Sequence, residues 1–215
     1  MPTVSELLST IKDLALVGAG DTSDDTRIMR YFNLQYKDLY RKTAQLYPTL
    51  LATNEASVTI TSGVGAIGAA PHKVIDVFDN GNTSNPLKAI TESTLKNQNP
   101  RMDDTGDPKN YYMTSTTAIK TYPVNSTTLS VDYIPRAETL TTSSAEADIK
   151  VPPEYHDLLV WGTLVWMSVD ERDKQAGGEL SLYQSKYEIA YGEYLEWLST
   201  VQVGDEFKTE NVLSG

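Results

Sequence analysis

The glycine-rich segment at residues 63–68 is the first place where residue types and spacing could do chemistry. Gly63, Gly65 and Gly68 match the G-x-G-x-x-G pattern of a dinucleotide-binding loop, and an alternating, strand-like run precedes them. Such a loop holds a pyrophosphate at the N-terminus of the helix that follows it. Here Pro71 and a second strand-like run follow instead. We therefore predict a turn between two strands and no cofactor site.

Acidic residues and histidines are the next candidates, for a metal site or for acid–base chemistry. Asp103, Asp104 and Asp107 surround a glycine, but their spacing is not that of an EF-hand. His72 and His156 lack the partners of a zinc-protease motif. The members of a Ser-His-Asp set need not be neighbours in sequence, but the chain contains no G-x-S-x-G elbow. We predict no catalytic residue, no metal, no cofactor and no enzymatic activity.

The composition is that of a globular chain with an acidic balance. The 215 residues include 18 basic and 29 acidic ones, for a net charge of −11, and no cysteine. Nucleic-acid binding without sequence preference needs an excess of lysine and arginine facing phosphates, so this balance argues against it. We expect no signal peptide, and the longest apolar run, residues 158–167, is too short to span a membrane.

Two helices are predicted before residue 48. Residues 3–17 form a short amphipathic helix, in which Thr3 and Glu6 have the spacing of a capping box. Residues 24–47 form a long helix with two stripes about 90° apart, of which one suits a core and the other asks for a further partner. The first stripe consists of Ile28, Phe32, Gln35, Leu39 and Leu46, and the second of Met29, Tyr36, Tyr40, Thr43 and Tyr47.

Alternating sequence rich in threonine and serine replaces the helical period after residue 55. A link at residues 86–94 is expected to be short and helical or irregular, and residues 136–147 form a polar connector. The runs predicted as strands are residues 57–62, 73–78, 110–116, 118–122 and 127–133.

A helical hairpin at residues 151–201 is the part against which we expect the rest of the chain to pack. Its first helix opens at Pro152 and Pro153, and it is apolar on nearly all sides, so it should be buried on more than one face. Its second helix carries a single stripe that repeats with the helical period. That stripe consists of Tyr183, Tyr187, Ala190, Tyr191, Tyr194 and Leu198.

Together these elements predict an α+β fold with segregated layers. The helices at both ends of the chain must meet, so we expect a helical bundle formed by N- and C-terminal helix pairs, with a β-rich insertion between them. The predicted segments are N-terminal helices at residues 1–54, the β-rich insertion at residues 55–150, the C-terminal hairpin at residues 151–201 and a C-terminal tail or arm at residues 202–215.

A basic face on the long helix is the one concentrated positive surface that the sequence indicates. Such a face could contact DNA phosphates or an acidic partner, or it could simply be solvated. The face consists of Arg27, Arg30, Lys37 and Arg41.

Five aromatic residues complete the candidate interface. Trp161 and Trp166 suit either an interface hot spot or the core. Tyr36 and Tyr40 belong to the second stripe of the long helix, which lacks an assigned partner. Phe207 is an apolar anchor of the acidic tail, which could lie on a neighbouring molecule.

Several motifs occur in an order that points to one family. They are YKDLYR at residues 36–41 with LYPTLL at residues 46–51, GDPKNYY at residues 106–112 leading to DYIP at residues 132–135, VPPEYHDLL at residues 151–159, and the tyrosine-rich helix at residues 183–194. In this order they resemble the head-to-tail adaptor proteins of short-tailed phages, the tail-tubular-A-like group. The chain departs from that pattern in the glycine-rich turn and in the acidic tail after residue 204.

The resemblance implies a structural virion protein of the phage neck, at the head–tail interface. It implies a homo-oligomeric ring, expected to be a dodecamer, that joins the portal to the tail and lines the DNA exit channel. A tail nozzle or tube protein would lie below the ring, with tail fibre or spike proteins at its side. DNA would pass without specific binding, and no membrane would be involved. The two-striped helix suits this assembly, because a head-to-tail ring needs surplus faces on both flanks of each subunit.

A second hypothesis comes from another class: a carbohydrate- or receptor-binding virion protein that uses the β-rich block. A sugar would then lie between aromatic residues such as Tyr111, Tyr112 and Tyr122. Against this, adjacent Tyr111 and Tyr112 must point to opposite faces of any strand. Glycan affinity of the β-rich block would favour this hypothesis, and sensitivity of the helix faces to mutation would favour the connector.

Overall fold

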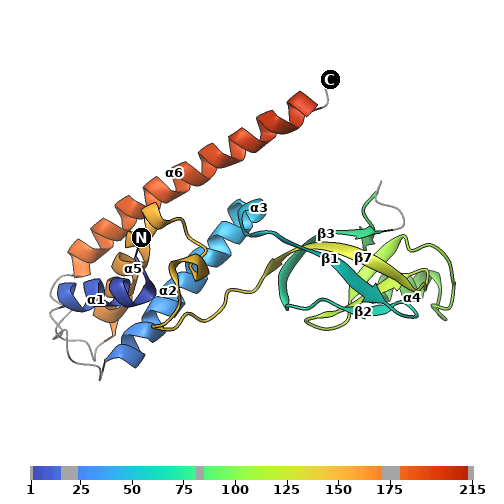
Figure 1. Cartoon of the computed structure of the whole chain (residues 1–215), viewed down its shortest axis with the longest axis horizontal. Coiled ribbons are helices and arrows are strands. Elements are labelled where there is room, and N and C mark those ends of the chain that lie inside the picture. Colours follow the sequence, from blue (N-terminus) through green and yellow to red (C-terminus); the bar gives the residue numbers. More distant parts are fainter. Residues whose placement is uncertain (1, 16–23, 81–84, 171–179, 213–215) are drawn as a thin grey trace. The chain divides into compact units, whose positions relative to one another are not determined.

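A computed structural model of the chain describes residues 2–15, 24–80, 85–170 and 180–212, with side chains as far as residue 200 (Figure 1). The chain divides into two compact units. The helical unit comprises Met1–Tyr47 and Glu138–Gly215, and the β unit comprises Pro48–Ala137. All described strands lie in the β unit and all long helices in the helical unit, so the fold is α+β as predicted. The finer division into four sequence segments stays a prediction.

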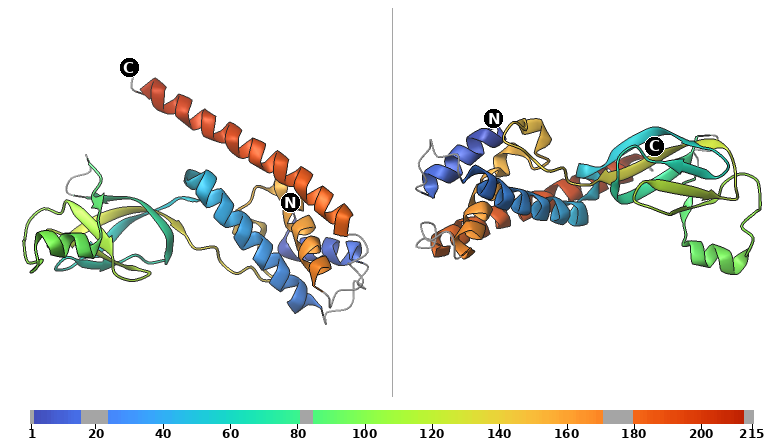
Figure 2. Two further views of the ribbon diagram at one scale, coloured as in Figure 1. Left: turned by 180° about the vertical axis from the view of Figure 1, so that it is seen from behind. Right: turned by 90° about the horizontal axis from the view of Figure 1, so that it is seen from below.

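Four helices and two short 3-10 turns make up the described part of the helical unit. In it, α5 packs against each of the other three helices, which lie around it in both views of Figure 2. The elements are α1 (Val4–Leu14), α2 (Asp25–Leu46), η1 (Glu146–Asp148), η2 (Pro153–Tyr155), α5 (Asp157–Val169) and α6 (Leu180–Val212).

The ends of these helices follow local sequence in two ways. At the start of α1, the backbone N–H of Glu6 donates to Thr3 Oγ1 at 3.3 Å, and the Glu6 carboxylate accepts from the Thr3 N–H at 2.7 Å, which confirms the capping box. At the other end of the chain, α6 continues through Gly204 to Val212, beyond the predicted hairpin. A single glycine costs a helix only about 1 kcal/mol, so Gly204 alone does not end it.

α2 buries both of its predicted stripes, because helices pack on it from more than one side. The exceptions are Leu46 of the first stripe, which is exposed at the end of the helix, and Met29 of the second, which is half-buried. Asn33 was missed: its amide donates to the carbonyl of Leu140 at 2.9 Å and accepts from the Leu140 N–H at 2.8 Å, which fastens the connector to the helix. The buried side chains of α2 are Ile28, Tyr31, Phe32, Asn33, Gln35, Tyr36, Leu39, Tyr40, Thr43 and Ala44.

The crossing of α2 and α5 depends on a glycine. A Cβ at Gly162 would lie 2.2 Å from the side-chain amide carbon of Gln35, so the two helices meet where α5 has no side chain. The Gln35 Nε2 donates to the hydroxyl of Tyr187 on α6 at 3.2 Å. A buried polar side chain thus links three helices at one point, and it retains a hydrogen-bond partner there.

Two small sheets form the β unit. The first has the order β1-β7-β3, and the second the order β2-β6-β5-β4, in which β4 pairs parallel to β5 and the other pairs are antiparallel. The strands are β1 (Thr53–Ile60), β2 (Val64–Ala66), β3 (Pro71–Asp79), β4 (Lys88–Ala89), β5 (Asn110–Met113), β6 (Ala118–Tyr122) and β7 (Thr127–Pro135).

The five predicted strands are all present, and the sequence missed several shorter elements. β2 and β4 have two or three residues each, too few to show an alternating pattern. The expected link before residue 94 contains β4 and the start of α4 (Glu92–Gln98), whose N-cap Thr91 accepts from the N–H of Thr94 at 3.2 Å. Pro48 follows α2 as predicted, but it also opens α3 (Pro48–Leu51).

The second sheet buries both of its faces along β5. Tyr111 belongs to the main core of the β unit, together with residues such as Val77 and Leu129. Tyr112 packs on the other face with Leu95 of α4. Neighbouring tyrosines therefore enter two different cores, as the period of a strand requires.

Candidate interface surfaces

The glycine-rich segment at residues 63–68 contains a turn of the β unit and no helix, as predicted, but it also contains the short β2 (Val64–Ala66). β1 ends before the segment and β3 follows it, so no helix N-terminus faces it. A Cβ at Gly65 would lie 2.7 Å from the carbonyl oxygen of Thr59, and Gly63 has a φ of +78°. The glycines thus serve close backbone approach in a hairpin.

Asp104 of the acidic loop and His156 have structural roles in the described residues. Asp104 accepts hydrogen bonds from the hydroxyl of Tyr122 and from Asn99 Nδ2 (2.7 Å), and these bonds hold the pKa of its carboxyl below the ordinary value. His156 is buried, with Nε2 2.8 Å from the carbonyl oxygen of Val151. Among the residues that the structure describes, no three His, Asp or Glu side chains gather as metal ligands.

The tyrosines proposed to hold a sugar are part of the interior. Tyr111, Tyr112 and Tyr122 are each less than a tenth exposed. The hydroxyl of Tyr122 is bound to Asp104, and its ring packs with Tyr112 and Leu95. A sugar stacks on an exposed aromatic face, and these three rings offer none.

The basic face of α2 interacts largely with its own chain. Arg27 pairs with Asp24 at 3.0 Å, and Arg41 with Asp38 at 3.4 Å. These neighbouring acids offset part of the positive charge, so the face is weaker toward DNA phosphates than its sequence suggests.

The other two cations of this face reach across to other segments. Arg30 lies 3.7 Å from the Asp170 carboxylate beyond α5, and it donates to the Tyr31 hydroxyl at 2.9 Å. Lys37 Nζ donates to Thr139 Oγ1 on the connector at 2.9 Å. An ion pair as exposed as that of Arg30 contributes about 0–1 kcal/mol, so a partner can rearrange it at little cost.

Tyr36 and Tyr40 do not lie on the surface of the single chain. Both rings are buried, and the Tyr36 hydroxyl donates to the Asp148 carbonyl at 3.3 Å. Burial raises the pKa of Tyr36 to about 12, because the ionised phenolate would lose its hydration. The second stripe of α2 therefore has partners within the helical unit: Tyr36 contacts η1, and Thr43 Oγ1 lies 2.7 Å from the hydroxyl of Tyr194 on α6.

The two tryptophans differ in their surroundings. Trp161 is half-buried and stacks on Tyr183 of α6, with ring centroids 6.3 Å apart. Trp166, five residues further along α5, is 46 % exposed. The side chain of Phe207 lies outside the described residues. Among the aromatic candidates whose side chains the structure describes, Trp166 is therefore the one that is available to a partner.

Further exposed apolar residues were not singled out from the sequence. An isolated leucine or isoleucine on a helix gives no sequence signal, because its exposure depends on which face the neighbouring helices leave open. In the described part of the helical unit, the large exposed hydrophobic residues are Leu34 (46 %), Leu46 (48 %), Trp166 (46 %), Val169 (59 %), Leu182 (50 %) and Ile189 (59 %).

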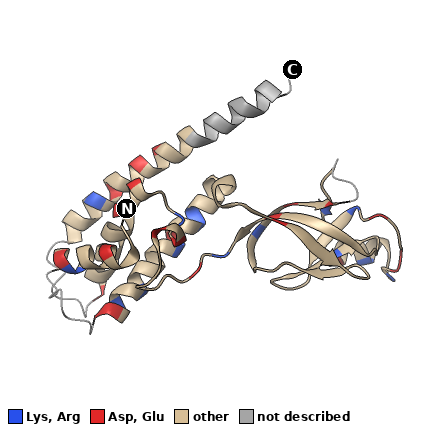
Figure 3. Cartoon of the chain, in the orientation of Figure 1, with Lys and Arg blue, Asp and Glu red and all other residues tan. Residues whose placement is uncertain are grey.

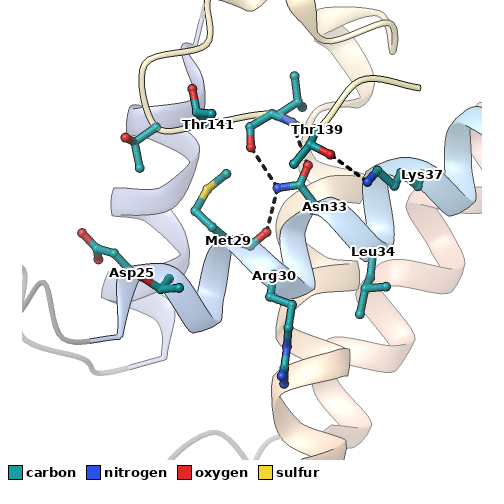
Figure 4. A pocket seen from close by; sticks show the side chains of 11 residues that line it. Asp25, Met29, Arg30, Asn33, Leu34, Lys37, Thr139 and Thr141 are labelled. Carbon is teal, nitrogen blue, oxygen red and sulfur yellow. Dashed lines mark hydrogen bonds between the residues drawn. The ribbon is translucent and has the colours of Figure 1, made fainter. Parts of the chain in front are cut away.

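A cavity of about 540 Å³ lies beside one of these residues, between α2 and the connector (Figure 4). Asn33 and Lys37 point toward the connector, whereas Arg30 and Leu34 point away from it. The lining mixes apolar side chains such as Met29 and Leu140 with Thr139, Thr141 and Thr142. This cavity makes the surface of α2 concave next to Leu34.

Charge is distributed unequally over the helices (Figure 3). α2 carries five basic side chains (Arg27, Arg30, Lys37, Arg41, Lys42) against two acidic ones (Asp25, Asp38). The described side chains of α6 include one basic residue, Lys186, against Glu188, Glu193 and Glu196. The two helices thus present surfaces of opposite sign.

The comparisons with known proteins identify the family of the chain. No helix in the described residues has the length and apolarity of a membrane span. No curated protein matches the chain. Residues 2–206 match the family described as SU10 adaptor protein, which covers nearly the whole chain. The chain therefore belongs to the SU10 adaptor protein family, and it is a structural head-to-tail adaptor of the phage virion neck.

Proposed function

We propose that this adaptor is the subunit of a ring that joins the portal to the tail and lines the DNA exit channel. Twelve copies are expected, with the four helices of each helical unit acting as one bundle of N- and C-terminal pairs. The observation that carries the proposal is the exposure of Trp166 and of the apolar residues on α2 and α6. Exposed large apolar side chains on a virion protein are the anchors that assembly interfaces use.

The charge of the chain suits a channel for DNA. A net charge of −11 removes the counterion release that drives non-specific binding to phosphates, so DNA can slide without adhering. The basic side chains of α2 contact their own acidic neighbours, which lowers their pull on DNA further. The proposal involves no cofactor and no catalytic step.

The remaining surfaces are assigned to the tail. A nozzle or tube protein would contact the ring on the side away from the portal, and fibre or spike proteins would bind its periphery. Carbohydrate binding is disfavoured, because Tyr111, Tyr112 and Tyr122 are buried.

Sedimentation velocity tests the proposal, with the protein alone and mixed with the portal ring of the same virus. We expect a stoichiometric complex with the portal, whether or not the free protein is a monomer. The Trp166→Ala variant should form this complex less well, and a variant at an exposed β-unit residue, Thr59→Ala, should form it normally. Failure to associate with the portal at every mixing ratio would overturn the proposed function.

A further inference from the structure

Two stripes on the outward sides of α2 and α6 each combine a large exposed apolar residue with charges of one sign. We call the first the basic–apolar stripe, which consists of Leu34, Lys37 and Arg41 of α2. We call the second the acidic–apolar stripe, which consists of Ile189, Glu193 and Glu196 of α6. Leu34 is 46 % exposed and Ile189 is 59 % exposed, and Leu34 points away from the connector (Figure 4).

α2 and α6 run in the same direction within one chain (Figure 1). Three side-chain contacts follow one another in the same order along both helices: Gln35 with Tyr187, Lys42 with Tyr191, and Thr43 with Tyr194. In a ring of about twelve copies, each copy is turned by about 30° from the next, so the α6 of a neighbour also lies nearly parallel to α2. A contact between these two helices in the ring must therefore match in the parallel direction.

The two stripes face opposite flanks of the helical unit. At 100° per residue, the members of the basic–apolar stripe lie about 100–160° around α2 from Gln35, which contacts α6. The members of the acidic–apolar stripe lie about 120–180° around α6 from Tyr187, which contacts α2. A head-to-tail ring needs this arrangement, because each subunit presents one surface to the copy before it and a different surface to the copy after it.

The spacing of the two stripes is complementary in the parallel direction. On α2, the two cations follow Leu34 by three and seven residues. On α6, the two glutamates follow Ile189 by four and seven residues. At 1.5 Å per residue the first offsets are about 5 and 6 Å, and the second are both about 10 Å. Parallel packing with Leu34 opposite Ile189 therefore brings each cation to the level of one glutamate.

Neighbouring registers fit less well. A shift by one helical turn would place Leu34 opposite Glu193 in one direction and opposite Ser185 in the other. Either shift would remove the contact between the two exposed apolar side chains. The sequence of the stripes thus selects one register.

The charged members of both stripes can take new partners. Within the described residues, Glu193 and Glu196 take part in no ion pair. Arg41 lies 3.4 Å from Asp38, but its side chain is 61 % exposed, and a pair as exposed as this contributes little. Burial under a second copy would strengthen the attraction of Arg41 to a glutamate, because the effective dielectric constant falls when water is excluded.

One pair of like charges lies at the N-terminal end of this contact. Arg30 precedes Leu34 by four residues and Lys186 precedes Ile189 by three, so the two cations come to similar levels. Arg30 lies 3.7 Å from the Asp170 carboxylate of its own chain, which offsets its charge. The two ion pairs at the other end of the contact therefore outweigh this repulsion.

We propose that the basic–apolar stripe of one copy of this chain packs parallel against the acidic–apolar stripe of the next copy. The contacts are Leu34 with Ile189, Lys37 with Glu193, and Arg41 with Glu196. The two stripes occupy opposite flanks of one subunit, so the contact is head-to-tail and repeats from copy to copy. The inference rests on the ring of the proposed function, and it assigns the contact between ring subunits to two named surfaces.

The absence of cysteine from the chain allows a direct test. Leu34→Cys and Ile189→Cys are prepared as separate proteins, mixed, and treated with a short thiol-to-thiol cross-linker, both alone and in complex with the portal ring. The mixture should give a covalent heterodimer on denaturing gels, whereas each variant alone should give little dimer.

A second pair of cysteines tests the direction of packing. Arg41→Cys mixed with Glu196→Cys should be cross-linked, because the parallel register places these positions at one level. Leu182 is exposed on the same side of α6 as Ile189, but it lies about 20 Å along the helix from the level of Arg41. Arg41→Cys mixed with Leu182→Cys is therefore the matched control, and it should remain uncross-linked.

Charge gives an independent check of the register. Arg41→Glu in the Leu34→Cys protein should reduce the heterodimer with Ile189→Cys several-fold, because two acidic side chains then meet. Glu196→Arg in the Ile189→Cys protein should restore much of it. A heterodimer yield that neither change alters would overturn the proposed register.

The outcomes separate this inference from the proposed function. Cross-linking of the first two mixtures above the control supports the parallel pairing of the stripes. If the portal complex forms and these mixtures are not cross-linked above the control, the pairing is wrong and the adaptor function stands. Efficient dimers of Leu34→Cys alone would also overturn the pairing, because they would indicate a symmetric contact. Absence of both the portal complex and the cross-links would overturn both.

Discussion

The helical unit and the β unit differ in how fully each buries its apolar side chains. Six of the eight large exposed hydrophobic residues in the described chain lie in the helical unit, and two, Leu50 and Val64, lie in the β unit. The β unit also covers both faces of β5, with Tyr111 and Tyr112 in separate cores. The helical unit has a buried core but leaves more large apolar side chains exposed than the β unit does, so we assign assembly to it.

The largest effect should come from the interior of the helical unit. Phe32→Ala removes a fully buried ring, and it should lower the free energy of unfolding by about 3–5 kcal/mol. The matched change, Leu34→Ala, lies two residues away on the outward side and should cost less than about 1 kcal/mol. Urea unfolding followed by tryptophan fluorescence measures both, since Trp161, Trp166 and Trp197 all belong to the helical unit. Equal losses would remove the distinction between interior and surface.

A smaller loss is expected at the crossing of α2 and α5. Gly162→Ala forces the Gln35 side chain from its place, and overpacking of this kind costs about 1–3 kcal/mol. Gly192→Ala on α6 is the control, because a Cβ there meets nothing within 4 Å and alanine favours a helix by about 1 kcal/mol. Opposite shifts of the urea midpoint would support the crossing as described. If Gly162→Ala leaves the free energy of unfolding unchanged, the Gln35 side chain can move aside without a cost in stability.

Trp166→Ala should separate assembly from stability. Because the indole is nearly half exposed, the variant should lose less than about 1 kcal/mol in free energy of unfolding while its association with the portal ring falls. Trp161→Ala, which removes a ring stacked on Tyr183, should show the larger thermal shift by circular dichroism. If Trp166→Ala instead has the larger shift and associates normally, the surface of the helical unit is not where assembly occurs.

The smallest expected effect concerns how the stability of the β unit changes at acidic pH. The hydroxyl of Tyr122 and the amide of Asn99 lower the pKa of Asp104 in the folded chain. A lowered carboxyl pKa adds stability above its unfolded value of about 3.9, and that stability is lost as pH falls through the folded value. Tyr122→Phe should therefore flatten the acid dependence of β-unit stability, read by amide hydrogen exchange. An unchanged acid profile would show that this hydrogen bond does not set the pKa.

Sequence patterns predicted the elements whose burial has a period. The stripe from Tyr183 to Leu198 and both stripes of α2 follow the helical repeat, and the structure buries most of their members. The five longer strands were found for the same reason. The short strands β2 and β4 were not predicted, because two or three residues are too few to show an alternating pattern.

The candidate interface was harder to predict, because its location depends on which faces are left uncovered. Tyr36 and Tyr40 were expected to need an outside partner, but they are buried within the helical unit. Leu34, flanked by cations, gave no signal, since a lone leucine on a helix is compatible with either side. Only the three-dimensional packing of the helical unit shows that Leu34 is exposed.

The place of β7 in its sheet has a consequence for synthesis of the chain. β7 is the last strand along the chain, yet it lies in the centre of its sheet, between β1 and β3. Because residues leave the ribosome in order, β1 and β3 cannot find their common neighbour until β7 has been synthesised. The first sheet can form only after that point. α1 and α2 emerge before either strand, but their partner α5 begins only at Asp157. The β unit is therefore completed while α2 still exposes its apolar stripes, and the newest part of the chain must fold back onto the oldest.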